Sequence, residues 1–123
     1  MRTKLLLVDD EAGIRNLFTN VAERLGFEVT AVETVDQFLA SYRAQPPSVM
    51  VMDLMMPQKD GVELMKSLAD DDCGVPIVLI SGSDGDLLGR VQRLGVARGL
   101  DIRGVLTKPI MLEDLEATLK NVA

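Results

Sequence analysis

The sequence Val49-Met50-Val51-Met52-Asp53-Leu54 forms an apolar run that one carboxylate interrupts near its end. A run of this length without polar alternation is typical of a strand that is covered on both faces, as in a parallel sheet. Asp53 then stands at the carboxyl end of that strand, where its side chain can point out of the core. The stretch therefore indicates a parallel α/β fold and marks the side chain most informative about function.

Four further apolar runs are similar in length to the first. They cover residues 4–8, 27–32, 75–80 and 103–106. Glu28 and Thr30 interrupt the run at 27–32, so we expect this strand at an edge of the sheet. Strands that alternate with helices imply βαβ units with right-handed crossovers. We therefore predict a doubly wound α/β fold, with a five-stranded parallel sheet and five helices.

Apolar residues recur at helical spacing between these runs. The pattern predicts helices over about residues 14–25, 35–42, 61–69, 84–94 and 112–122. Thr34 is a suitable N-cap for the second helix, and Gly26 stands where a C-terminal cap would follow the first. No linker is long enough to divide the chain, so we expect one domain over residues 1–123.

The composition excludes several classes of protein. A net charge of −6 argues against non-specific binding to nucleic acid or to an anionic membrane. Histidine is absent, which excludes a Cys/His zinc site and a Ser-His-Asp triad. Cys73 has no partner for a disulfide within the chain, as expected in a reducing compartment. No apolar run approaches the roughly 20 residues that span a bilayer, and no signal peptide precedes the first strand, so we expect a soluble cytoplasmic protein.

Polar side chains follow four of the five apolar runs. In a doubly wound sheet, ligands bind at the carboxyl ends of the strands. The residues at these ends are Asp9, Asp10 and Glu11, then Asp53, then Ser81, Gly82 and Ser83, and finally Thr107, Lys108 and Pro109. We expect carboxylates, a hydroxyl and an ammonium group to meet at one edge of the sheet.

Asp9, Asp10 and Asp53 cannot lie close together as unpaired charges, because like charges in one site repel and raise one another's pKa. A hard divalent cation removes this conflict. Mg²⁺ fits best, since it favours carboxylate oxygens and is often completed by waters and a phosphate oxygen. Alone, an Asp-Asp pair is more often a helix N-terminus, where acids meet backbone amides and the helix dipole. The matching positions of Asp53 and Lys108 favour the metal site.

Asp53 is suited to accept a phosphoryl group, because a carboxylate at a strand tip can attack phosphorus and form an aspartyl phosphate. Such a transfer depends mainly on positioning and on neutralisation of charge. Mg²⁺ would cover one phosphoryl oxygen, Lys108 a second, and the Ser81 hydroxyl or a nearby amide the third. Taken singly, Lys108 is an ordinary loop lysine, and Ser81 or Ser83 is an ordinary N-cap of the fourth helix.

These segments together resemble the receiver domain of two-component response regulators. The motifs are Leu-Leu-Leu-Val-Asp-Asp-Glu at 5–11, Met-Asp-Leu-Met-Met-Pro at 52–57 with Asp60-Gly61, Ile-Ser-Gly at 80–82 and Thr-Lys-Pro at 107–109. They span nearly the whole chain in the fitting order. The resemblance implies a flavodoxin-like sheet with the strand order 2-1-3-4-5.

The resemblance implies a role for each acidic residue of the pocket. Asp53 would be the phosphoacceptor and would also bind the metal. Asp10 and Asp9 would bind Mg²⁺, with Asp9 able to act through a water, and the backbone carbonyl of Met55 would be a further ligand. Mn²⁺ could replace Mg²⁺ at such a site. Met55 and Ser83, placed beside the pocket, would influence the rate of dephosphorylation.

The resemblance also implies a switch and its partners. Lys108 would pair with the phosphoryl group, the Lys108–Pro109 bond would be cis, and Ser81 would be the hydroxyl that moves toward the phosphate. The donor would be a sensor histidine kinase or a histidine phosphotransfer protein. An output domain or partner would read the face of the fourth helix, fifth strand and fifth helix, and a homodimer could form on phosphorylation.

Two positions depart from the pattern of the family. Many relatives have an aromatic residue three positions before the lysine, where this chain has Val105. Without it, Ser81 would couple to helix and loop movement alone. Gly82 stands where alanine is common, and this could loosen the loop after the switch hydroxyl.

The segment between Ser81 and Lys108 is long, and it resembles receivers joined to cyclic-di-GMP phosphodiesterase (EAL) domains. Arg90, Arg93, Arg98 and Arg103 gather in it. These arginines are either a solvated face or a docking surface for a partner.

Two alternative functions share features with this interpretation. A haloacid-dehalogenase-type phosphatase also uses an aspartyl phosphate, but it needs Asp-x-Asp, and Met55 stands two positions after Asp53. A pseudo-receiver would bind its partner without phosphorylation. A P-loop NTPase is excluded, because the chain lacks Gly-x-x-x-x-Gly-Lys-Ser/Thr.

Overall fold

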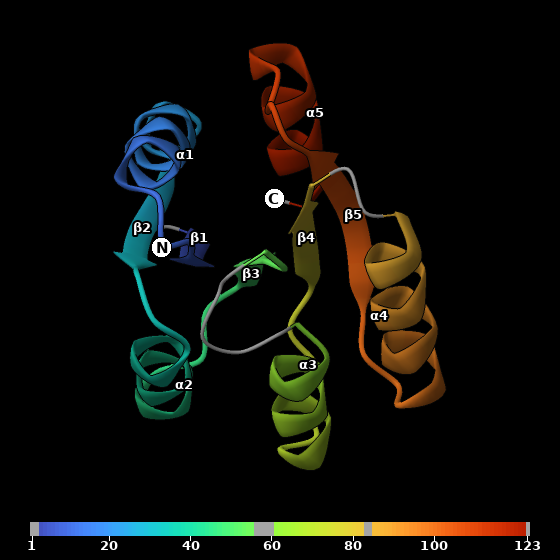
Figure 1. The fold of residues 1–123 in the computed structure, drawn as a ribbon. Helices are drawn as coiled ribbons and strands as arrows, with labels where there is room; N and C mark the ends of the chain where they lie inside the picture. The colour runs from blue at the N-terminus through green and yellow to red at the C-terminus, as the bar shows by residue number, and fades with distance from the viewer. Residues whose placement is uncertain (1–2, 56–60, 83–84, 123) are drawn as a thin grey trace.

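Strands and helices alternate along the whole of the computed structural model, which describes residues 3–55, 61–82 and 85–122. The elements are β1 (Thr3–Val8), α1 (Ala12–Arg24), β2 (Phe27–Val32), α2 (Val35–Ala44), β3 (Val49–Asp53), α3 (Gly61–Asp70), β4 (Ile77–Ser81), α4 (Gly85–Ala97), β5 (Ile102–Thr107) and α5 (Leu112–Val122). The strands form one sheet in the order β2-β1-β3-β4-β5, and all neighbouring pairs are parallel (Figure 1). The predicted fold class, strand order and edge position of residues 27–32 are confirmed.

Several residues named in the predictions cannot be compared with the structure. The site residue Ser83, the motif residues Pro57 and Asp60, and Asp84 at the start of the predicted fourth helix lie outside the described residues.

The sheet separates two apolar cores, because successive side chains of a strand point to opposite faces. Helices α1 and α5 cover one face, where Phe18 and Leu115 are fully buried. Helices α2, α3 and α4 cover the other face, with Phe38, Met65 and Val91 fully buried (Figure 1). Because the strands are covered on both faces, β3 and β4 are buried along their entire lengths.

The fourth strand differs from the prediction at both ends. It begins at Ile77 and not at residue 75, because Pro76 has no N–H to donate to a sheet ladder. The Pro76 carbonyl still accepts the N–H of Met50 at 2.9 Å. The strand continues to Ser81, which pairs with Thr107 of β5. The switch position therefore lies on the last residue of a buried strand.

The two predicted helix caps are confirmed, although α1 begins two residues earlier than predicted and α4 ends three residues later. The Thr34 hydroxyl accepts the N–H of Gln37 at 3.1 Å, and the Gln37 side chain accepts the N–H of Thr34 at 3.2 Å, so α2 begins with a reciprocal capping box. Gly26 follows α1 with a φ of 96°, a left-handed conformation that suits glycine. Among the described residues, no helix has both the length and the apolar character that crossing a bilayer would require.

Helix α4 lies very close to its neighbours at Gly95. A Cβ atom at this position would lie 2.5 Å from Cδ1 of Ile102 in β5 and 2.9 Å from Cε of Met65 in α3. Both distances are shorter than real Cβ contacts. Both atoms are side-chain ends, so an added methyl group would force these ends to shift. Glycine avoids this overpacking, although it is an unfavourable residue inside a helix.

We predict opposite effects for alanine at two glycines of α4. Gly95→Ala should lower the free energy of unfolding by about 1–3 kcal/mol, because the new methyl group overpacks the α4–β5 contact. At Gly89 a Cβ would meet only the end of the flexible Arg93 side chain. Gly89→Ala should therefore raise the free energy of unfolding by up to about 1 kcal/mol. Urea denaturation of both variants checks this, and equal effects would contradict the close contact at Gly95.

Candidate functional site

Four strand ends meet at the carboxyl edge of the sheet. Val8 pairs with Met52 across β1 and β3, so Asp9 and Asp53 follow neighbouring positions. Asp53 pairs with Ile80 of β4, and the main-chain N–H of Lys108 donates to the Ser81 carbonyl at 2.9 Å. The parallel register thus brings residues from β1, β3, β4 and β5 together, as predicted.

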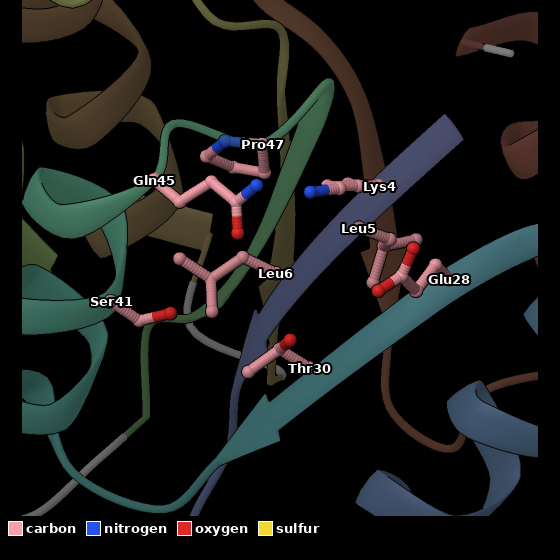
Figure 2. A pocket seen from close by; sticks show the side chains of 8 residues that line it. All are labelled: Lys4, Leu5, Leu6, Glu28, Thr30, Ser41, Gln45 and Pro47. Carbon is pink, nitrogen blue, oxygen red and sulfur yellow. The ribbon is translucent and has the colours of Figure 1, made fainter. Parts of the chain in front are cut away.

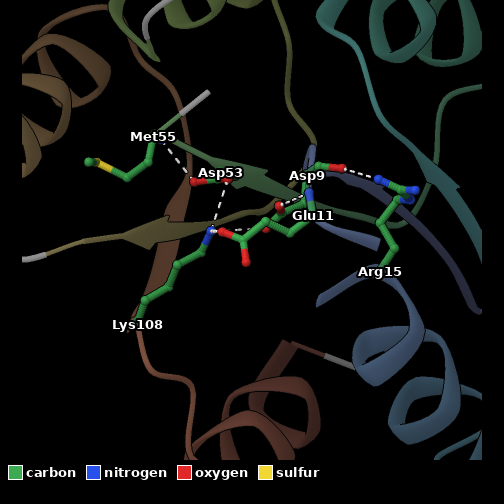
Figure 3. Close-up of polar contacts among 6 residues, drawn as sticks. All are labelled: Asp9, Glu11, Arg15, Asp53, Met55 and Lys108. Atoms are coloured by element: carbon green, nitrogen blue, oxygen red, sulfur yellow. Dashed lines mark hydrogen bonds and ion pairs between the residues drawn. The ribbon is translucent and has the colours of Figure 1, made fainter. Parts of the chain in front are cut away.

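Asp53 is buried at the tip of β3, and both of its carboxylate oxygens are held (Figure 3). Oδ1 accepts the main-chain N–H of Met55 at 2.8 Å, and Oδ2 accepts a hydrogen bond from Nζ of Lys108 at 3.2 Å. The short turn after the strand therefore fixes one oxygen, and the side chain of Lys108, the residue after β5, neutralises the other.

Asp9 is fully buried and is held by its own loop and helix. Its main-chain N–H donates to the Val32 carbonyl at 3.1 Å, and its Oδ1 accepts the N–H of Glu11 at 2.8 Å. The Arg15 guanidinium donates to the Asp9 carbonyl at 2.9 Å. Within the described part of the chain, Oδ2 of Asp9 has no hydrogen-bond partner, and Nζ of Lys108 lies 3.6 Å away.

The environment of Asp9 makes its carboxyl harder to ionise than usual when no metal is bound. Burial raises its pKa to about 6, the nearby Asp53 carboxylate also raises it, and the Glu11 N–H and Lys108 oppose this shift. A buried carboxylate oxygen that lacks a hydrogen-bond donor is a position where a cation can be accommodated.

Lys108 is the cation that faces these acids. Its Nζ lies 2.7 Å from Oε1 of Glu11, 3.2 Å from Oδ2 of Asp53 and 3.6 Å from Oδ2 of Asp9. Partial burial tends to lower the pKa of Lys108, but the Glu11 hydrogen bond and the charges of Asp53 and Asp9 raise it overall. The peptide bond from Lys108 to Pro109 is cis, as predicted.

The acidic residues fit a divalent cation. Asp9, Asp10 and Asp53 each offer a carboxylate oxygen, and these oxygens lie within 4.8 Å of one another. Oxygen ligands of this kind suit Mg²⁺ or Mn²⁺. Asp10 is exposed, whereas Asp9 and Asp53 are buried, so the three carboxylates face both the core and the solvent. The role of the Met55 carbonyl stays a prediction.

The other predicted positions lie around this pocket. Ser81 is buried at the end of β4. A Cβ atom at Gly82 would lie 3.3–3.4 Å from three side-chain atoms of Met55, so the Met55 side chain lies against this glycine. Val105 pairs with Leu79 and packs, half-buried, against the core that α4 covers.

Two residues of the site were not assigned a role from the sequence. Glu11 was placed at the end of the first strand without a role of its own, yet it makes the shortest contact to Lys108. Arg15 holds the Asp9 carbonyl from the first turns of α1. A third acid directly after Asp9 and Asp10, and a cation one helical turn beyond it, were the signals that could have indicated them.

A small cavity lies at the opposite end of the sheet (Figure 2). Its volume is about 50 Å³, and it is lined by Lys4, Leu5, Leu6, Glu28, Thr30, Ser41, Gln45 and Pro47. This space can hold a few water molecules, whereas pockets for organic ligands usually measure about 300–1,000 Å³. This cavity is therefore too small for an organic ligand.

A family model for the response regulator receiver domain matches residues 5–120. The chain belongs to this family. The family consists of phosphoacceptor switches of two-component systems and not of classical enzymes, and receiver domains bind Mg²⁺ at an acidic pocket. The match confirms the resemblance and decides against the phosphatase alternative.

Curated relatives of this receiver domain include transcriptional regulators. TrcR of Mycobacterium tuberculosis, a transcriptional regulatory protein, is 30% identical over 119 residues, which cover 97% of this chain and 44% of TrcR. PhoP of Bacillus subtilis, the alkaline phosphatase synthesis transcriptional regulatory protein, is 30% identical over 122 residues, which cover 99% of this chain and 49% of PhoP. The receiver domain thus spans about half the length of the curated relatives it matches.

Solved structures show the same receiver fold. The chemotaxis response regulator CheY4 of Vibrio cholerae superposes with a TM-score of 0.83 at 26% identity, over 100% of both chains. A response regulator from Colwellia psychrerythraea gives a TM-score of 0.83 at 30% identity, over 99% of this chain and 97% of that one. The likeness to receivers joined to EAL domains stays a prediction.

The raised pKa of Asp9 predicts a pH-dependent effect of Asp9→Asn in the metal-free receiver domain. Ionisation of Asp9 between its unfolded pKa of 3.8 and its folded pKa of about 6 weakens the wild-type fold as pH rises. Asparagine avoids this loss and can still accept the Glu11 N–H. The variant should gain about 2–3 kcal/mol of stability at pH 7 and almost nothing at pH 4.

Chemical denaturation at several pH values, with a chelator present, measures this gain. A gain of the same size at pH 4 and pH 7 would assign the effect to packing and not to charge.

Proposed function

We propose that residues 1–123 are one receiver domain, in which Asp53 accepts a phosphoryl group from a histidine kinase or a histidine phosphotransfer protein. The observation that carries this proposal is the pairing of a buried carboxylate with an ammonium group, Oδ2 of Asp53 lying 3.2 Å from Nζ of Lys108. Membership of the receiver family supports it.

Oδ2 of Asp53 is the attacking atom in this proposal. Its lone pair forms a bond to phosphorus while the P–N bond of the phosphohistidine breaks. The leaving imidazole nitrogen keeps the electron pair of that bond, and a proton from solvent restores the neutral ring. Hydrolysis of the resulting acyl phosphate by water releases inorganic phosphate and regenerates the carboxylate.

The metal site serves this transfer. Asp9, Asp10 and Asp53 would hold Mg²⁺, with the Met55 carbonyl as a further ligand, and Mn²⁺ suits the same oxygens. The bound ion supplies positive charge against the phosphoryl oxygens. The buried Oδ2 of Asp9, which has no hydrogen-bond donor among the described residues, supports this assignment.

In this proposal, Lys108 and Ser81 respond to phosphorylation by binding the phosphoryl oxygens. A phosphoryl group adds close to two negative charges, and the Lys108 ammonium, already beside Oδ2, can transfer to a phosphoryl oxygen. The Ser81 hydroxyl, on the last residue of β4, would approach another phosphoryl oxygen. Better contacts in one conformation bias the equilibrium between two states.

The output of the switch is read on α4, β5 and α5. Val105 replaces the aromatic residue of many relatives, so the bias would travel through α4, which packs closely at Gly95. The greater length of TrcR and PhoP supports an output domain in the whole protein, and their names favour control of transcription. An exposed arginine group on α4, the turn after it and β5, comprising Arg90, Arg93, Arg98 and Arg103, would belong to this surface.

We predict that the intact protein gains the mass of one phosphoryl group when it is incubated with Mg²⁺ and a small phosphodonor. Asp53→Asn should abolish the gain, because an amide oxygen is a poor nucleophile and the charge that pairs with Lys108 is lost. Asp72→Asn is a matched control, since Asp72 is exposed and asparagine tolerates its φ of 53°.

Intact-mass spectrometry, with and without a chelator, measures these outcomes. No gain in the wild-type protein would favour a pseudo-receiver, and an equal gain in Asp53→Asn would place the phosphoryl group elsewhere.

A further inference from the structure

Lys108 makes its shortest contact with a residue that neither accepts the phosphoryl group nor holds the metal in the proposed function. Nζ lies 2.7 Å from Oε1 of Glu11, compared with 3.2 Å from Oδ2 of Asp53 (Figure 3). Glu11 and Lys108, which are 97 positions apart in the chain, thus meet beside the phosphoacceptor Asp53. The ammonium group is shared between its future phosphoryl partner and Glu11.

Glu11 makes this contact in place of a local one. It occupies the N-cap position of α1, but its side chain makes no capping hydrogen bond. Residues that cap helices well have short side chains, such as Ser, Thr, Asp and Asn. The longer glutamate instead reaches across the pocket to Lys108. Its main chain still serves the site, because the Glu11 N–H holds Oδ1 of Asp9.

Glu11 also differs from the other carboxylates in its exposure. Its side chain is 59% exposed, whereas the side chains of Asp9 and Asp53 are fully buried. A solvated carboxylate loses little when its partner leaves, because water replaces the ion pair. Glu11 can therefore release Lys108 easily, which a buried acid could not.

We propose that Glu11 is a positioning residue that competes with the phosphoryl group for the Lys108 ammonium. This inference rests on the proposed phosphorylation of Asp53. In the unphosphorylated receiver domain, Glu11 holds Nζ at 2.7 Å and shares it with Asp53 at 3.2 Å, so Lys108 neutralises Asp53 and Asp9 less completely and their oxygens stay open to a cation. When Asp53 is phosphorylated, Glu11 must give up this contact, and its charge opposes the incoming anion.

The competition has opposite consequences for metal binding and phosphoryl transfer. Removal of the Glu11 charge should weaken Mg²⁺ binding, because one anion is lost and Lys108 can settle on the metal's own ligands. The same removal should speed phosphorylation at saturating Mg²⁺, because the ammonium is free and the pocket mouth is less negative. A residue that only ligated the metal or supported the fold would not produce this pair of opposite effects.

Glu11→Gln tests the proposal with two measurements. Calorimetric titration of the unphosphorylated protein should show the Kd for Mg²⁺ rising about two- to fivefold, the range expected when one charge of a partly exposed pair is removed. The initial rate of mass gain from a small anionic phosphodonor at saturating Mg²⁺ should also rise about two- to fivefold. Glu23→Gln, which removes an exposed charge at the other end of α1, should change neither.

Glu11→Asp separates the contact from the charge. Aspartate keeps the negative charge but is one methylene shorter, and it is expected to cap α1 and to release Lys108. Phosphorylation should be faster than in the wild type, while Mg²⁺ affinity stays closer to wild type than in Glu11→Gln.

Three outcomes would overturn the proposal. They are a Glu11→Gln rate at or below the wild-type rate, a Glu11→Asp rate equal to wild type, and equal changes in Glu23→Gln. Absence of mass gain in the wild-type protein itself would instead count against the phosphoacceptor function.

Discussion

Two buried carboxylates at neighbouring strand ends, Asp9 and Asp53, create a charge problem that the rest of the site resolves. Neither residue can move out of the site, because the backbone of each continues a strand of the buried sheet. Oδ1 of each acid accepts a main-chain N–H two residues further on. The remaining oxygens face one ammonium, and burial still raises the pKa of Asp9 to about 6. Lys108 neutralises the negative charges of Asp9 and Asp53 only in part, and a divalent cation would neutralise the remainder.

The sheet makes this arrangement possible through its order and register. Because β1 and β3 are central neighbours and β4 follows β3, loops from distant parts of the chain leave the sheet side by side. The two faces are closed by different sets of helices, α1 with α5 and α2 with α3 and α4. Polar residues are therefore left at the strand ends, where hydration, a metal and a phosphoryl group remain within reach.

The sequence predicted the strands and helices because their signals are local, whereas the strand order came only from the resemblance to receiver domains. Apolar runs locate strands, and the polar residues at the end of each run then fall at the carboxyl edge, which places Asp9, Asp53, Ser81 and Lys108. The start of the fourth strand was placed two residues too early, because Val75 continues the apolar pattern although Pro76 cannot donate to the ladder. The contact between Glu11 and Lys108 could not be predicted, since it depends on the direction of two long side chains across the pocket.

The packing of α4 limits how phosphorylation can travel outward. Val105 is half-buried beside Leu79 and fills less space than an aromatic ring, so it has little capacity to rotate between an inner and an outer position. Gly95, in contrast, places α4 against the ends of the Ile102 and Met65 side chains, which an added methyl group would force to shift. A tightly packed contact of this kind is sensitive to small shifts, because packed interiors do not deform continuously. Phosphorylation would therefore be transmitted by repositioning α4 as a unit, with the α4–β5 contact as the part that must rearrange.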